Sequence, residues 1–155
     1  MCHTKLKQQD ISQVIQIYQD RLGNELSREA ALQGLTMIAN NHKGQAKNSV
    51  TEVIPLSNLH NFLPSFFDLL KKSQRQLNLY TLECLEAFTR RYSNQFSGQI
   101  GQLQSELSKL IDDQDVQRTT LALQVATNVI SAYPKNKDKH QEVLHKAALV
   151  SGTEL

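Results

Sequence analysis

The sequence contains no tryptophan and few of the residues that interrupt helices. Its 155 residues include only six glycines and three prolines. Leu, Gln, Ala, Ser, Glu and Lys dominate instead, a composition more typical of helices than of sheets. The length suits one ordinary domain that buries about two-thirds of the surface of its unfolded chain. We therefore expect a single all-α unit.

A large excess of charge of either sign is also missing. Seventeen Lys and Arg residues stand against fifteen Asp and Glu residues, which leaves a formal net charge of +2. A protein that works by neutralising phosphates carries a much larger positive excess. Nucleic acid is therefore not expected as the main partner.

Cysteine is scarce, and long apolar runs are absent. The two cysteines are Cys2 and Cys84, and the chain has no Asn-x-Ser/Thr glycosylation site, which fits a reducing compartment. The first residues have no apolar signal region, and no apolar run is long enough to span a bilayer. We expect a protein of the cytoplasm or nucleus that does not contact membranes.

Apolar residues recur at spacings of three and four through seven segments, which predicts seven helices. The second carries Ala30, Leu32, Leu35 and Ile38. Pro64 is tolerable only in the first turn of its helix or at a kink, and Asp115 is suited to cap the helix that follows it. Polar residues 41–58 are expected to form a loop. The helices are expected at about residues 11–22, 30–38, 59–70, within 70–92, 96–111, 115–133 and 140–150.

The apolar pattern of residues 59–92 returns 41 residues later. Examples are Phe62 with Leu103, Leu85 with Ala126 and Phe88 with Val129. A repeat of this length built from two antiparallel helices predicts a HEAT-type α-solenoid, in which each pair buries its apolar stripe against the next. Residues 1–155 would form one array of about three and a half antiparallel helix pairs, with repeats at about 8–40, 59–92 and 96–133 and a partial one at 137–150.

Two stretches carry a more specific resemblance. "FLPSFFDLLKKSQRQLNLYTLECLEAFTRRYSNQF" and "LSKLIDDQDVQRTTLALQVATNVISAYP" resemble the central HEAT repeats of the cullin-associated and neddylation-dissociated proteins. The likeness covers about residues 18–135, although members of that family are several times longer. It implies a non-catalytic protein that grips cullin–RING ligase scaffolds and governs exchange of their substrate receptors. Its most specific residues are Lys72, Gln74, Arg75, Leu77, Leu79, Thr81 and Leu82.

The sequence offers no catalytic or metal-binding motif. Phosphate-binding glycine loops, H-E-x-x-H, G-x-S-x-G and Cys-x-x-Cys are all absent. His140 and His145 are five residues apart and so do not share a helix face as zinc ligands would. Cys2 and His3 are interpreted as residues of an unpaired tail, and Cys84 as a small core residue. We expect neither enzymatic activity, nor a metal, nor a cofactor.

Protein binding therefore remains as the expected function. The second helix of each HEAT pair lines the concave side of the array, where partners are usually held. A basic ridge of Lys71, Lys72, Arg75, Arg90 and Arg91 would attract an anionic partner, and uncapped ends would favour self-association. The alternative is a HEAT adaptor of the nuclear-transport or phosphatase-scaffold type with another protein partner. The residues expected to make contact are Glu83, Glu86, Arg90, Gln124, Thr127 and Asn128.

Overall fold

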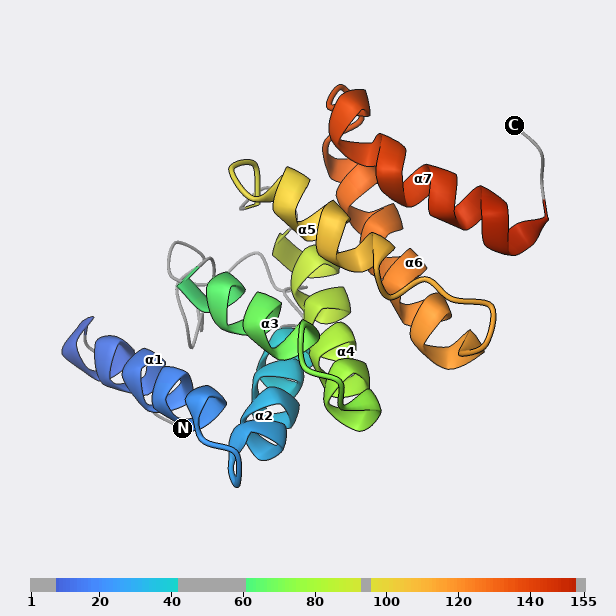
Figure 1. The fold of residues 1–155 in the computed structure, drawn as a ribbon. Helices are drawn as coiled ribbons and strands as arrows, with labels where there is room; N and C mark the ends of the chain where they lie inside the picture. Colours follow the sequence, from blue (N-terminus) through green and yellow to red (C-terminus); the bar gives the residue numbers. More distant parts are fainter. Residues whose placement is uncertain (1–7, 42–60, 93–95, 153–155) are drawn as a thin grey trace.

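The computed structural model describes residues 8–41, 61–92 and 96–152, and within those ranges it contains seven α-helices and no strand (Figure 1). The predicted all-α class is confirmed. Apart from Asn41, which still belongs to the second helix, the predicted 41–58 loop lies outside the described residues. The helices are α1 (Gln8–Gly23), α2 (Arg28–Asn41), α3 (Leu63–Leu70), α4 (Arg75–Tyr92), α5 (Ile100–Ser108), α6 (Val116–Ala132) and α7 (Lys137–Ser151).

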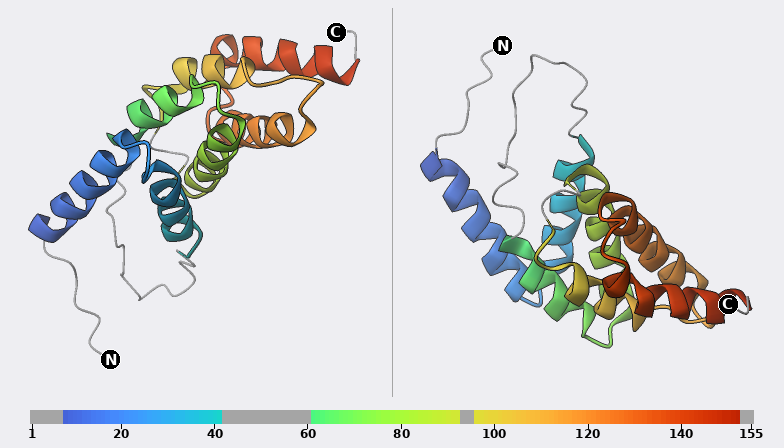
Figure 2. Two further views of the ribbon diagram at one scale, coloured as in Figure 1. Left: turned by 60° about the horizontal axis from the view of Figure 1, so that its bottom comes forward. Right: turned by 90° about the horizontal axis from the view of Figure 1, so that it is seen from above.

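The helices are arranged in two rows. Helices α1, α3, α5 and α7 lie side by side in one row, and α2, α4 and α6 form the other (Figure 2). Consecutive helices pair across the rows, α1 with α2, α3 with α4 and α5 with α6. The first and last helices lie at opposite ends of this stack. The arrangement is consistent with an α-solenoid, in which each pair contacts only its neighbours.

Several helix ends follow directly from the sequence. Pro64 occupies the first turn of α3, where its missing N–H costs no hydrogen bond. Asp115 caps α6, because its Oδ1 accepts the backbone N–H of Arg118 at 3.1 Å. Tyr133 is the C-cap of α6, and Pro134 follows it. At the end of α7, Gly152 adopts the left-handed conformation with φ of 69°, which glycine tolerates best.

Two sequence predictions about helices were wrong in detail. The helix expected over 96–111 is limited to Ile100–Ser108, because a turn closed by Gln99 N–H and Phe96 O (3.0 Å) precedes it. The backbone N–H of Phe96 donates instead to the Tyr133 hydroxyl at 3.1 Å. In α2 the buried alanines are Ala31 and Ala39, whereas Ala30 is exposed. Ala31 precedes Leu35 by four residues and therefore shares its helix face.

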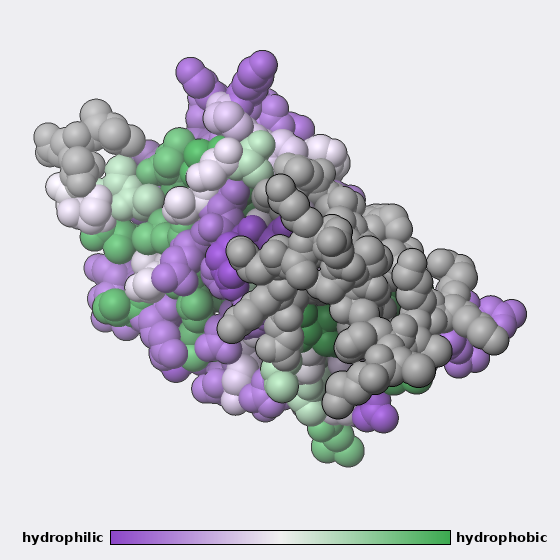
Figure 3. Space-filling model, turned by 180° about the vertical axis from the view of Figure 1, so that it is seen from behind, coloured by the Kyte–Doolittle hydropathy of each residue, from purple (hydrophilic) through white to green (hydrophobic). Residues whose placement is uncertain are grey.

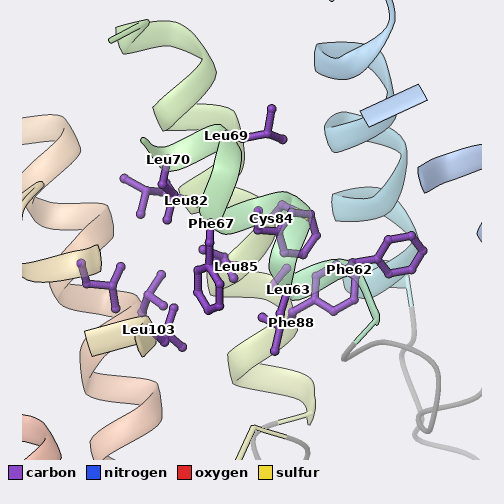
Figure 4. Packing of buried hydrophobic residues seen from close by; sticks show 14 of the residues in the cluster. Phe62, Leu63, Phe67, Leu69, Leu70, Leu82, Cys84, Leu85, Phe88 and Leu103 are labelled. Carbon is purple, nitrogen blue, oxygen red and sulfur yellow. The ribbon is translucent and has the colours of Figure 1, made fainter. Parts of the chain in front are cut away.

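The core lies between the two rows and is centred on α3 and α4 (Figure 4). The ring centroids of Phe62 and Phe66 are 6.3 Å apart, and those of Phe66 and Phe88 are 5.7 Å apart. Leu85 and Val129, two members of the apolar pattern that repeats after 41 residues, are buried. Burial of each such side chain contributes about 1.5–3 kcal/mol.

Equivalent side chains tie the α3–α4 pair and the α5–α6 pair together at their turns. In the α3–α4 pair, the buried Asn78 amide donates to the carbonyls of Leu69, Leu70 and Lys72 at 3.1–3.3 Å. Forty-one residues later, the Thr119 hydroxyl donates to Asp112 O at 2.6 Å, and Thr119 Oγ1 accepts the Asp112 backbone N–H at 2.8 Å. Both therefore satisfy backbone groups that a helix end would leave unpaired.

A second repeated contact links one pair to the next. The first residue of α2, Arg28, donates to the Gln74 amide oxygen just before α4. The first residue of α4, Arg75, makes two hydrogen bonds of 2.7 and 3.0 Å to Asp115, just before α6. The Arg75 guanidinium, followed by the Arg118 backbone N–H, lowers the pKa of Asp115 below its ordinary value. These bonds fix the position of each helix in the α2–α4–α6 row along the axis of its neighbour.

Helix α7 is attached through a buried histidine. The two ring nitrogens of His140 contact the Gln104 amide at 2.9 Å and the Tyr133 carbonyl at 2.8 Å. With the proton on Nε2, the ring donates to Tyr133 and accepts from Gln104. His140 therefore connects α7 to α5 and to the end of α6.

We predict that Leu85→Asp destabilises the protein by at least ~3 kcal/mol, because it places an unpaired carboxylate among buried apolar side chains. Thermal denaturation followed by circular dichroism measures the change. Glu83→Asp, at an exposed position of the same helix, is the matched control and should cost only a few tenths of a kcal/mol. An unchanged melt for Leu85→Asp would contradict the described packing.

The Cys84 thiol is completely buried, as predicted. Burial raises its pKa to about 12, and a side-chain hydrogen bond with Thr36 opposes that shift. The thiolate is the reactive species, so a raised pKa makes the folded thiol inert. Because the unfolded thiol has a pKa of about 8.5, the native state should lose stability as the pH rises from there towards 12.

We therefore predict that a thiol reagent at neutral pH labels Cys84 only at the rate at which local or global unfolding exposes its side chain. The measurement uses a Cys2→Ser variant, so that Cys84 is the remaining thiol, and compares labelling with and without denaturant. Equal rates in both conditions would show that Cys84 is accessible in the folded protein.

Candidate protein-binding face

The residues expected to contact a partner occupy two neighbouring helices of the same row. Helices α4 and α6 pack side by side. On α4 the chosen positions are three and four residues apart, and on α6 Thr127 and Asn128 lie three and four residues after Gln124, so each set lies on one side of its helix. We call this surface the inner-helix face. It consists of Glu83, Glu86 and Arg90 on α4 and Gln124, Thr127 and Asn128 on α6.

On α4, Arg90 connects the inner-helix face to the preceding helix pair. Its Nε donates to the Glu86 carboxylate at 3.0 Å, and its Nη2 donates to the Asn40 side-chain oxygen on α2 at 2.7 Å. The Arg90 side chain is still 48% exposed. Part of its hydrogen-bonding capacity therefore holds α2 against α4, and its open side remains accessible to a partner.

On α6, Asn128 makes the corresponding link back to α4. Its side-chain amide donates to Thr89 Oγ1 at 3.2 Å and to the Glu86 carbonyl at 3.4 Å. The Thr89 hydroxyl in turn donates to Leu85 O at 2.8 Å. Asn128 is half-buried, and its side-chain amide is already used to hold α6 against α4.

Three members of the face have no bond to another helix. Glu83, Gln124 and Thr127 are exposed. The Thr127 hydroxyl donates to Leu123 O of its own helix at 2.7 Å, and no described residue bonds to the side chains of Glu83 or Gln124. Figure 3 shows this side of the molecule, with hydrophilic and hydrophobic residues interspersed over the described surface. The side chains of these three residues are therefore the part of the inner-helix face that is most available to a partner.

Sequence reasoning missed Asn40 and Thr89, which complete the hydrogen-bonded line from α2 to α6. The signal for Asn40 was present, because it precedes Arg90 by fifty residues, the offset at which Leu35 corresponds to Leu85. Thr89 gave no such signal, because a buried threonine within a helix usually bonds only to its own backbone.

The predicted basic ridge is divided between the two ends of α4. Arg75 is the first residue of α4, and Arg90 lies near its end, about 22 Å away along the axis. At the far end, Arg91 Nε donates to Ala39 O at 3.0 Å. Lys71 and Lys72 remain with Arg75 at the near end. An anionic partner could therefore not be held by all five cations along one continuous ridge.

The described residues hold no group of three or more His, Cys, Asp or Glu side chains that could bind a metal ion. Cys2 and His3 lie outside the described residues. In the part of the chain that the structure describes, no helix is both long and apolar enough to cross a bilayer.

A search against protein-family models found no match. Among curated proteins, the chain is similar to "Cullin-associated NEDD8-dissociated protein 1" of Drosophila melanogaster, with 27% identity over 129 residues. The similarity covers 83% of this chain and 10% of that protein. The chain is therefore similar to a short part of a much longer protein, and the similarity covers most of the chain.

Proposed function

We propose that this chain is a non-catalytic HEAT-repeat segment that binds a cullin scaffold through its inner-helix face. It would act in the assembly of cullin–RING ubiquitin ligases and in the exchange of their substrate receptors, in the cytoplasm or nucleus. The observation that carries the proposal is the similarity to a cullin-associated protein, which extends over 83% of the chain.

The geometry supports a binding role in two ways. Helix pairs stacked in two rows form an extended surface along the inner helices, on which a long partner can lie. The inner-helix face is held rigid by the Arg90–Asn40 and Asn128–Thr89 bonds. A surface that is already ordered loses less entropy when a partner binds.

The affinity of this chain alone should be low. A stable interface buries about 1,600 Å² of surface, and a segment corresponding to 10% of the relative's length can supply only a part of the contacts made by such a long protein. Micromolar or weaker binding is expected.

The test is a titration of the chain against an unmodified cullin–RING complex by biolayer interferometry. In the test variant, Glu83→Lys, Glu86→Lys and Arg90→Glu reverse the charges of the face. Because the charges at positions 86 and 90 are exchanged, an ion pair between these two side chains can still form, as Arg90 and Glu86 do in the unmodified chain. We predict a changed association rate and salt dependence. The variant should stay folded, with a melting temperature lowered only slightly by loss of the Arg90–Asn40 bond.

The control is Asp68→Lys on the outer helix α3, which changes the net charge by the same +2 at an exposed position. It should bind as the unmodified chain does. If both variants bind like the unmodified chain, the inner-helix face is not the contact surface. Binding to the GTPase of nuclear transport, and not to the cullin complex, would favour the adaptor alternative.

A further inference from the structure

A pocket lies where the α3–α4 turn meets α5 and the start of α6. Its volume is about 440 Å³, within the range of sites that bind small groups or side chains. Residues of two successive helix pairs line it. Five of the lining side chains are cations, namely Lys71, Lys72, Arg75, Lys109 and Arg118.

Two of these cations are already neutralised by close carboxylates. Arg75 is bound by both oxygens of Asp115 at 2.7 and 3.0 Å. Lys109 Nζ donates to Glu106, itself a lining residue, at 3.1 Å. These pairs shape the pocket and leave little charge for a ligand.

The other three cations keep their capacity to bind an anion. The Lys72 ammonium has no hydrogen-bond or ion-pair partner among the described residues. Lys71 is 3.9 Å from Asp68, and both side chains are more than half exposed, so their attraction is weak. The carboxylate oxygens nearest to the Arg118 guanidinium belong to Asp112 at 3.9 Å and Asp115 at 3.8 Å, beyond hydrogen-bond distance.

Arg118 is the most informative of the three. Its side chain is only 22% exposed, yet its guanidinium donates no hydrogen bond to any described residue, and its buried Nε lacks a partner. Guanidinium groups bind carboxylates through two parallel hydrogen bonds. A partly buried arginine with unused donors, beside the weakly paired Lys71 and the unpaired Lys72 ammonium, is suited to an acidic ligand.

We propose that this pocket binds an acidic segment of a protein partner, with one carboxylate at Arg118 and another at Lys71 and Lys72. The buried Leu70 and Leu110 also line the pocket, and the methylene groups of a glutamate can pack against them. The cations are confined to one pocket rather than spread along a stripe, which favours a short acidic peptide over a nucleic-acid backbone. The site lies at the turns and is separate from the inner-helix face.

The test is fluorescence polarisation with a short labelled peptide of alternating Glu and Ser, at about 50 mM salt, where surface charges are weakly screened. A Gln–Ser peptide and a phosphoserine–Gln peptide are the other probes. We expect the Glu–Ser peptide to bind and the Gln–Ser peptide not to bind. Lys71→Glu with Lys72→Glu should weaken binding of the Glu–Ser peptide roughly tenfold.

The matched control is Lys135→Glu with Lys137→Glu, two exposed lysines beyond the far end of α6, which carries the same change in net charge. It should retain most of the binding. A second variant, Arg118→Lys, keeps the charge but removes the planar fork, and it should also weaken binding. Equal losses in both double variants, binding of the phosphoserine peptide alone, or no binding of the Glu–Ser peptide would each overturn the proposal. None of these outcomes depends on cullin binding.

Discussion

The packing of α4 between α2 and α6 is the interaction on which the rest of the structure depends. Helix α4 contacts both neighbours in its row and pairs with α3 across the core. Leu77, Leu82 and Leu85 are fully buried as a result. The terminal helices α1 and α7 have a neighbour on only one side within their row and expose Ile17, Leu144 and Leu149. Stability in a stacked array comes largely from neighbour interfaces, so it should be greatest at α4 and decline towards both ends.

Polar contacts fix the register between neighbouring helices, which apolar packing alone would not determine. Apolar side chains can slide by a turn along a neighbouring helix at modest cost, whereas directional hydrogen bonds cannot. The Arg75–Asp115 contact holds one end of the α4–α6 interface, and the Asn128–Thr89 contact lies further along it. The same rigid frame presents two different surfaces, the inner-helix face and the cationic pocket at the turns.

The sequence was sufficient for what depends on local periodicity and local capping. The seven segments, the Asp115 cap and the burial of Cys84 and Leu85 all follow from spacings within one helix. The sequence was less reliable at helix boundaries. Phe96 was predicted to begin a helix, but its backbone N–H bonds to the hydroxyl of Tyr133, the C-cap of α6. It could not show that Asn128 bonds to Thr89 and so holds α6 against α4, because a spacing pattern within one helix does not give distances between helices. Whether the six residues of the inner-helix face bind a partner stays a prediction.

Amide hydrogen exchange under native conditions tests the central claim most directly, because it reports the opening free energy of each helix separately. We predict that the amides of α4 exchange slowest, and that those in the middle of α1 and α7 exchange at least ~10 times faster. Protection in α1 or α7 equal to that in α4 would contradict an array stabilised from its central helix outwards.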